Sequence, residues 1–411
     1  MGQNLITVLD VGSTKLSCVI ARAEAGGAIR VLGLGHHYNQ AVELGRITNE
    51  AALEHGVRVV LDKAERMAGL KVEDVWVTTA LGNQSADVVS VDVAVGGHAV
   101  EAADVENVYD AARAHPLNPD RRLLHMSPAC YSLDGRFGVT DPIGEIAEML
   151  GLDMHLVTAE RSTIDIIETM VRSAHVDVKM IIATAQAASL GATKPEERET
   201  GVAVVEIGGG ATGISVFCHN ALAHLSYHPI GGVSVTRDIS TALRLPVTQA
   251  ERLKTLYGNV LHCPADHREC IDLSEGGAGK SSFPKSVLTG IIRPRMEELL
   301  EAVRADLQQV GFFALGQARR PRLVLTGGGT QLPGVQHLAE QLFPCSVRIG
   351  YPMGLVGLAD AMAGPAFSAL AGAFPFIDQQ PEEREVWTSP LPPNLAMRPL
   401  SRVSRWFRNH F

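Results

Sequence analysis

Two segments far apart in the chain follow the same pattern of strand, acid, glycine turn and second strand. The first runs from the apolar strand Leu5–Asp10 through the turn Val11–Lys15 (VGSTK). The second runs from Gly201–Ile207 through Gly208–Gly213 (GGGATG). Consecutive backbone N–H groups in such a turn form a binding place for phosphate. The repeat predicts two similar halves whose turns face each other across a cleft and hold one polyphosphate.

A third glycine turn and several helical patterns complete this arrangement. The turn Thr326–Thr330 (TGGGT) follows the strand Arg322–Leu325, and another strand is expected at Asp74–Thr79. Helices are expected at Asn49–Ala68, Thr163–Ala174, Thr248–Tyr257, Arg293–Val310 (starting at Arg293-Pro294) and Gly334–Leu342. Strands that alternate with helices predict an α/β fold with largely parallel sheets.

Residues from about 84 to 159 depart from this alternation. Ser85–Val95 and Arg122–Leu133 read as strands, and Ala102–Ala114 reads as a helix. This composition indicates a small α+β insertion within the first half. Leu355–Phe374 has the length of a membrane span, but Asp360, Pro365 and its many small residues favour a buried, close-packed helical segment.

The C-terminal residues 398–411 (RPLSRVSRWFRNHF) form an amphipathic pattern. At about 100° per residue, four apolar residues share one stripe, Trp406 flanks it and three arginines occupy the opposite face. The membrane-contacting residues are expected to be Leu400, Arg402, Val403, Arg405, Trp406, Phe407, Arg408 and Phe411. A helix docked on its own domain or on a partner would show a similar pattern. The preceding residues 377–397 are rich in Pro, Glu and Gln, which predicts a flexible linker and favours a helix that lies on an anionic membrane.

Bulk properties exclude several classes of protein. A chain of 411 residues is too long for one core and predicts two or more subdomains. The net charge of −9 argues against a general nucleic-acid binder. Six scattered cysteines without a C-x-x-C pair predict a reduced, cytoplasmic protein.

The two acids that end the repeated strands are the candidate metal ligands. Asp10 and Glu206 are expected to hold Mg²⁺ through water, because hard cations prefer carboxylate and water oxygens. Lys15 is expected to neutralise a phosphate. The alternative is that both turns are merely tight connections between strands.

The motifs DVGSTK, EIGGGATG and LTGGGTQLPG resemble the phosphate-1, phosphate-2 and adenosine motifs of the actin/Hsp70/sugar-kinase ATPase superfamily. Within it, the order and spacing of the motifs, the insertion and the amphipathic tail resemble the FtsA family of bacterial cell-division proteins. Gly231–Ile239, Ala250–Gly258 and Ile292–Leu299 add to this resemblance.

The resemblance implies an actin-like, two-lobed fold with the α+β subdomain inserted in the first lobe. The implied first-lobe core (IA) comprises residues 1–83, 163–195 and about 350–376, and the insertion (IC) comprises 84–162. The second-lobe core (IIA) comprises 196–230 and 311–349, and subdomain IIB comprises 231–310.

The resemblance also implies ATP and Mg²⁺ in the cleft. The residues that would contact the nucleotide are Asp10, Gly12, Ser13, Thr14 and Lys15 on one side, Glu206, Gly208, Gly209, Gly210 and Thr212 on the other, and Glu251, Lys254, Gly327, Gly328, Gly329 and Leu332 around the ribose and adenine. Gly231 and Gly232 are further nucleotide-binding candidates. Gln186 and Glu206 are the candidate catalytic residues, with Gln186 placed to orient water.

Two departures from the family pattern bear on catalysis. The family usually has Asp where Glu206 stands, and FtsA proteins usually carry Asp where Gly213 stands. In-line hydrolysis depends on a well-positioned water, so nucleotide binding is expected to survive better than turnover. We therefore expect weak ATPase activity or none.

The resemblance finally implies partners and a location. The chain is expected to polymerise, to bind the C-terminal peptide of the tubulin-like FtsZ at subdomain IIB, and to meet later division proteins at the insertion. Its place would be the inner face of the cytoplasmic membrane at the division site. The alternatives are a pilus-type actin-like scaffold and a small-molecule kinase, for which the linker and tail would have no use.

Overall fold

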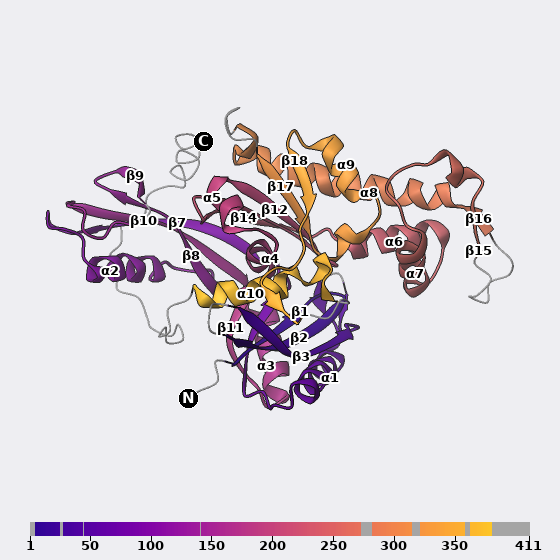
Figure 1. Ribbon diagram of the computed structural model, residues 1–411, viewed down its shortest axis with the longest axis horizontal. Helices are drawn as coiled ribbons and strands as arrows, with labels where there is room; N and C mark the ends of the chain where they lie inside the picture. The colour runs from indigo at the N-terminus through magenta and orange to yellow at the C-terminus, as the bar shows by residue number, and fades with distance from the viewer. Residues whose placement is uncertain are drawn as a thin grey trace.

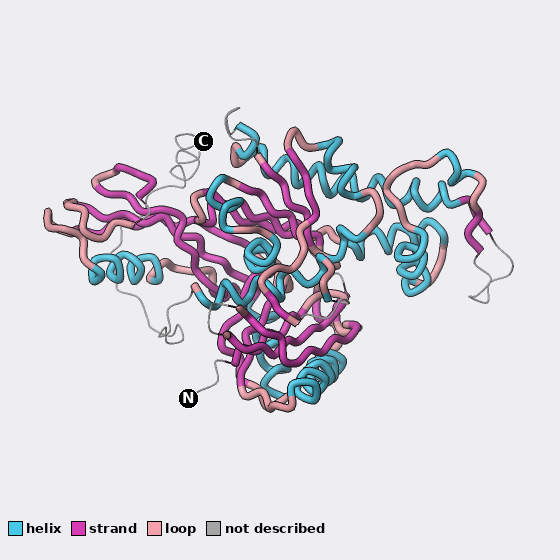
Figure 2. Tube along the Cα trace, in the orientation of Figure 1, coloured by secondary structure: helices cyan, strands magenta, loops and turns pink. Residues whose placement is uncertain are grey.

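The computed structural model describes residues 5–24, 28–43, 45–139, 141–272, 282–314, 321–357 and 362–379. Two lobes lie one above the other in Figure 1, with an inserted domain on one side and a helical extension on the other. Figure 2 shows that strands dominate the inserted domain, whereas the opposite extension is mostly helical. The alternation of strands and helices in both lobes confirms the predicted α/β class.

The first lobe is built on a six-stranded sheet with the order β11-β6-β1-β2-β3-β19. β1 pairs antiparallel with β2 and parallel with β6, which in turn pairs parallel with β11. The strands are β1 (Leu5–Val11), β2 (Lys15–Ala23), β3 (Ile29–Tyr38), β6 (Asp74–Thr79), β11 (Asp177–Ala183) and β19 (Leu355–Val356), and a small ladder joins β4 (Val42–Glu43) to β5 (Arg46–Ile47). Helix α1 (Glu50–Ala68) packs against β2 and β3, and α3 (Arg161–Ser173) packs against α1.

The second lobe repeats this topology. Its sheet has the order β14-β13-β12-β17-β18, with β12 antiparallel to β13 and parallel to β17. The elements are α5 (Pro195–Thr200), β12 (Val202–Ile207), β13 (Thr212–Cys218), β14 (Ala221–His228), β17 (Arg322–Thr326), α9 (Val335–Leu342) and β18 (Ser346–Ile349). β12 thus takes the place of β1, and β13 that of β2. Both predicted glycine turns connect the first two strands of their lobes, so the structure confirms the sequence repeat.

The inserted domain has a four-stranded sheet and a core of its own. The strand order is β7-β10-β8-β9. Its elements are β7 (Ser85–Ala94), α2 (Ala102–Arg113), β8 (Arg121–Leu133), β9 (Arg136–Val139) and β10 (Met149–Glu160). Val108, Leu150, Leu152 and Met154 are fully buried in its hydrophobic cluster, which is separate from those of the two lobes.

The helical extension shows one error of the sequence prediction. Its elements are α6 (Gly232–Leu243), α7 (Val247–Tyr257), the 3-10 turn η1 (Pro264–His267), β15 (Cys270–Asp272), β16 (Ser282–Pro284) and α8 (Lys285–Gln309). Helix α8 begins eight residues before Arg293 and carries Pro294 in its interior. A proline is favoured at a helix start but can be accommodated inside one. Here Leu288 and Ile292, before the proline, are buried together with Met296 after it, so packing of one continuous face outweighs the lost backbone hydrogen bond.

Two helices cross where the lobes meet. α4 (Thr184–Ala192) packs against α10 (Ser368–Asp378), and a Cβ added to Gly372 would lie 1.7 Å from the Ala187 carbonyl oxygen. The predicted helical segment Leu355–Phe374 is instead divided between β19, the 3-10 turn η6 (Pro365–Phe367) and α10. Pro365 starts a new turn rather than continuing a helix. α10 ends at Asp378, two residues into the predicted linker, because Phe374 and Phe376 hold its last turns in the core.

Candidate functional site

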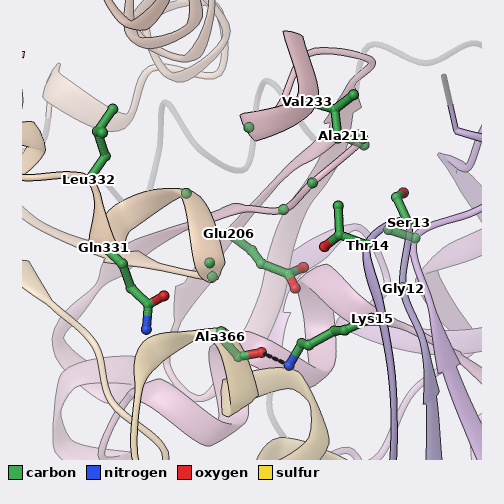
Figure 3. A pocket seen from close by; sticks show the side chains of 18 of the residues that line it. Gly12, Ser13, Thr14, Lys15, Glu206, Ala211, Val233, Gln331, Leu332 and Ala366 are labelled. Atoms are coloured by element: carbon green, nitrogen blue, oxygen red, sulfur yellow. Dashed lines mark hydrogen bonds between the residues drawn. The ribbon is translucent and has the colours of Figure 1, made fainter. Parts of the chain in front are cut away.

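A cavity of about 410 Å³ lies between the lobes and collects most of the predicted site residues. Its walls come from both repeated turns, the third glycine turn and helix α7. Figure 3 shows the carboxylate of Glu206 between Thr14 on one side and Gln331 on the other. The predicted residues that line it are Asp10, Gly12, Ser13, Thr14, Lys15, Glu206, Gly208, Gly209, Gly210, Gly232, Glu251, Lys254, Gly327, Gly328, Gly329 and Leu332.

The first turn is held by hydrogen bonds at its base. The Gly12 N–H donates to the Lys15 carbonyl oxygen at 3.0 Å, which closes the hairpin between β1 and β2. Asn39 braces it from β3: its backbone N–H donates to the Thr14 carbonyl oxygen at 2.9 Å, and its side-chain amide donates to the Gly12 carbonyl oxygen at 2.8 Å. No motif marked Asn39 in the sequence, because its role depends on the pairing of β2 with β3.

The second turn has the same closure. The Gly208 N–H donates to the Ala211 carbonyl oxygen at 2.9 Å. The first turn of α6 holds it from behind, since the Gly232 N–H donates to the Gly208 carbonyl oxygen at 2.9 Å and the Val233 N–H to that of Gly209 at 2.8 Å. These bonds satisfy N–H groups that a helix start leaves free.

Thr212 and Gly231 lie behind the second turn rather than at the cavity surface. Thr212 is fully buried, and its hydroxyl donates to the Ile230 carbonyl oxygen at 2.7 Å. A Cβ added to Gly231 would lie 2.6 Å from the carbonyl oxygens of Gly208 and Gly209. Both residues therefore support the turn and do not line the cavity, and their contact with nucleotide stays a prediction.

The two turns approach each other until no side chain fits between them. A Cβ added to Gly209 would lie 2.6 Å from Thr14 Cγ2, and one added to Gly210 would lie 2.6 Å from Ser13 Oγ. Contacts that short do not occur between real atoms without a shift. Glycine at positions 209 and 210 leaves room for the side chains of Thr14 and Ser13, so the turns of the two lobes can approach this closely.

Two buried carboxyl groups and one ammonium group occupy the floor of the cavity. Burial raises the pKa of the Glu206 carboxyl to about 7, and the nearby Asp10 adds to that increase. Burial also raises the pKa of Asp10, against the opposing effects of Lys15 and of the Thr78 hydroxyl, which donates to it at 2.9 Å. Lys15 Nζ lies 3.9 Å from Asp10 Oδ2, and burial lowers the pKa of Lys15. The floor of the cavity therefore has two carboxyl groups and a single ammonium group beside them.

Lys15 also reaches a segment that the sequence did not connect with it. Its ammonium group donates to the Ala366 carbonyl oxygen, drawn as a dashed line in Figure 3, and lies 3.4 Å from the centre of the Phe367 ring. The contact joins the first turn to η6 across 351 residues of sequence. Only the packing of α10 beneath the cleft brings these residues together.

The third glycine turn and α7 complete the opposite wall. Gly327 has φ +86°, a conformation that favours glycine, and its N–H donates to the Pro365 carbonyl oxygen at 3.1 Å. Lys254 Nζ on α7 donates to the Gly232 carbonyl oxygen at 3.0 Å and pairs with Glu251 at 2.7 Å. Thr236 of α6 also donates to the Glu251 carboxylate, so the predicted Glu251–Lys254 pair is fixed to the helix that supports the second turn.

One of the two candidate catalytic residues, Gln186, lies away from the cleft, and the glycine at 213 has a structural cause. Gln186 does not line this cavity; it lines a second cavity and is hydrogen-bonded to Ser127. The cause is helix geometry: Thr184 of α4 lines the cleft, and a residue two positions further along lies about 200° around the helix. At Gly213, an added Cβ would lie 2.5 Å from Ala185 Cβ, so an acid could not replace this glycine without moving α4.

The ionisation of Glu206 predicts a pH dependence of stability. Its pKa in the folded protein, about 7, lies above the ordinary value of 4.5. The contribution of this carboxyl to the free energy of unfolding is therefore most favourable below pH 4.5. It is lost as the pH rises towards 7, where ionisation of the buried carboxyl costs about 3 kcal/mol. We expect Glu206→Gln to stabilise the nucleotide-free protein in EDTA more at pH 8 than at pH 5.5, as measured by urea denaturation. Glu301→Gln, at an exposed position of α8, is the control and should behave alike at both pH values. An equal effect of Glu206→Gln at the two pH values would contradict a buried carboxyl with a raised pKa.

The predicted membrane residues lie outside the described part of the chain. These are Leu400, Arg402, Val403, Arg405, Trp406, Phe407, Arg408 and Phe411, with most of the predicted linker. Among the helices that are described, each is too short or too polar to cross a bilayer.

Comparison with known proteins agrees with this architecture. The model of the family described as cell division protein FtsA matches residues 203–372, and that of the SHS2 domain inserted in FTSA matches residues 83–158. The chain is 38% identical to the cell division protein FtsA of Agrobacterium fabrum over 383 residues, covering 90% of this chain and 86% of the relative. It is 32% identical to that of Pseudomonas aeruginosa, covering 99% and 98%.

Solved structures share the fold at low sequence identity. A chain of the PilM-PilN type IV pilus biogenesis complex superposes with a TM-score of 0.63 at 18% identity, covering 92% of this chain and 99% of that one. MreB 5 of Spiroplasma citri bound to AMPPNP superposes with a TM-score of 0.53 at 11% identity, covering 92% and 97%. These likenesses establish the actin-like fold. Because the sequence relatives match along nearly the whole chain and the inserted domain matches as well, this protein belongs to the FtsA family of cell division proteins.

Proposed function

We propose that the cleft binds MgATP and that the chain acts as a nucleotide-dependent membrane anchor of the division machinery. The observation that carries the nucleotide site is the meeting of two equivalent glycine turns from opposite lobes, each ready to present backbone N–H groups. The MreB 5 structure with AMPPNP, which has the same fold, supports this assignment.

The residues present fit such a ligand. Cβ atoms at Gly209 and Gly210 would fill the narrow space between the turns, as expected of a cradle made by backbone. Asp10 and Glu206 are buried near each other beside Lys15, and a divalent cation would balance the charge that the two carboxylates carry when ionised. Asp10 and Glu206 would hold Mg²⁺ through water, the turns would hold the phosphates, and Gly327–Gly329 with Leu332, Glu251 and Lys254 would surround the nucleoside.

Nucleotide turnover is proposed to be slow or absent. Gln186 is hydrogen-bonded to Ser127 on the side of α4 that faces away from the cleft. Position 213 is a glycine and so supplies no carboxylate to orient water. Glu206 is the one predicted catalytic residue that lines the cleft, and its raised pKa leaves it partly protonated near neutral pH. Bound nucleotide would chiefly set the angle between the lobes.

The wider role follows the subdomain limits proposed from the sequence. Subdomain IIB, residues 231–310, would bind the C-terminal peptide of FtsZ, and the insertion at 84–162 would meet later division proteins. The lobe cores would stack into filaments, and residues 398–411 would anchor them to the inner face of the cytoplasmic membrane. One amphipathic helix binds weakly and reversibly, whereas a filament offers many helices at once.

Hydrogen exchange tests the nucleotide site. We expect MgATP to slow exchange of the backbone amides of residues 13–14 and 209–211, because bound phosphate would take the N–H groups that do not close the turns. The control is the same protein with ATP in EDTA, which should show weaker protection. Unchanged exchange in both turns at saturating MgATP would reject the site.

A further inference from the structure

The inserted domain touches the first turn of α4 through buried hydrogen bonds. The Ser127 hydroxyl of β8 is hydrogen-bonded to both ends of the Gln186 side-chain amide, at 2.8 Å to Nε2 and 3.1 Å to Oε1. Both side chains are only 6% exposed. Buried polar groups of this kind are costly to separate, because each partner would be left without a hydrogen bond.

A second contact lies one turn of α4 earlier. The Ala183 N–H, at the N-terminal end of α4, donates to Nε2 of His125 at 3.2 Å. Burial lowers the pKa of His125 to about 3, so the ring is neutral and can accept this bond. His125 also packs edge-on against Phe376 of α10, with ring centres 5.1 Å apart. β8 is therefore attached to both helices that cross between the lobes.

The opposite side of the same helical turn lines the nucleotide cleft. Thr184 lies between Ala183 and Gln186 in the sequence and is a wall residue of the cleft. All nine residues of α4 are buried, so the helix can move only together with its neighbours. A displacement of Thr184 would therefore move Gln186, which lies in the same helical turn, and Gln186 is hydrogen-bonded to Ser127.

A cavity borders this attachment. Gln186 and Ser127 line a second cavity, of about 540 Å³, between β8 and the turn from β13 to β14. β7 and β8 also contact β14 of the second lobe. The domain thus contacts both the crossing helix and the second lobe, with open space between the two contacts. A close-packed contact would resist small rotations of the inserted domain, whereas a cavity leaves room for them.

We propose that the Ser127–Gln186 pair couples the nucleotide cleft to the orientation of the inserted domain, with Gln186 as a positioning residue. The inference rests on the proposed nucleotide site. A ligand that draws the lobes together shifts the first turn of α4, and the pair passes that shift to β8. By linkage, whatever binds the inserted domain in its shifted orientation also changes nucleotide affinity.

The test compares hydrogen exchange with and without MgATP in the full chain and in Ser127→Ala. In the wild-type protein, MgATP is expected to change exchange in β7 and β10 as well as in the two turns. In Ser127→Ala the turns keep their protection, and the change in β7 and β10 falls at least fivefold. Gln186→Met, which keeps the volume and removes the amide, should give the same result.

Two further variants separate coupling from loss of packing. Ser85→Ala removes the hydrogen bond between Ser85 and Thr158, inside the same sheet and away from α4, and should respond like the wild type. Ser127→Thr keeps the hydroxyl and should restore the response. Protected turns with no change in β7 and β10 of the wild type, or an unchanged response in Ser127→Ala, would overturn the coupling alone. Unprotected turns would overturn the nucleotide site and the coupling with it.

Discussion

Deletion of residues 398–411 is expected to release the protein from vesicles that contain anionic lipid. In a helix, Leu400, Val403, Phe407 and Phe411 would share one stripe and three arginines would lie on the other face. Burying an aromatic or large aliphatic side chain contributes roughly 1.5–3 kcal/mol, and each arginine near an anionic surface adds about 1 kcal/mol. We expect the vesicle-bound fraction in co-sedimentation to fall at least tenfold.

Point variants in the full chain distinguish the apolar stripe from the charge. Phe407→Glu should reduce binding nearly as much as the deletion, whereas Phe407→Leu keeps an apolar side chain at that position and should lose little. Binding should weaken as salt increases, because exposed charges are screened. Equal binding of the deleted and complete proteins would show that the membrane contact lies elsewhere in the chain.

The repeated turns were predictable because they depend on local sequence. A strand that ends in an acid, followed by glycines and a hydroxyl, specifies a hairpin tip with little help from the rest of the fold. Both turns therefore lie where the pattern placed them, between β1 and β2 and between β12 and β13. The insertion was predictable in part, since Ser85–Val95 alternates in polarity, whereas β10, which is buried along most of its length, was not predicted.

The sequence does not show which distant residue a side chain contacts in the folded protein. Lys15 was assigned to a phosphate by its place in the motif, and its contact with Ala366 depends on how η6 enters α10. Asn39 and Ala366 have no motif of their own. Their functions arise from strand pairing and from the crossing of two helices.

Gln186 illustrates the same limit within a single helix. The resemblance selected Gln186 by its place in the chain, but which face of α4 meets the cleft depends on the rotation of that helix. Thr184 faces the cleft, so Gln186 faces the inserted domain. The start of α8 is a related case, because the buried Leu288 and Ile292 decide where the helix begins and Pro294 does not.

Gly209→Asp is expected to lower the affinity for MgATP at least 100-fold, equivalent to about 2.7 kcal/mol. Its Cβ would lie 2.6 Å from Thr14 Cγ2, so the two turns must separate to admit the side chain. The carboxylate would then stand close to where phosphate should bind, in a site that already contains Asp10 and Glu206. Equilibrium titration with a fluorescent ATP analogue measures the affinity.

Two glycine substitutions separate the contributions of volume and charge. Gly209→Ala adds the Cβ alone, against a methyl group that can shift, and should give a smaller loss than Gly209→Asp. Gly290→Asp makes the same chemical change in α8 at a position with no atom within 4 Å of the added Cβ, and should bind like the wild type. Thermal unfolding of each variant shows whether the fold is retained. Wild-type affinity in a folded Gly209→Asp would mean that phosphate does not lie between the turns, because no ligand could share that space with a carboxylate.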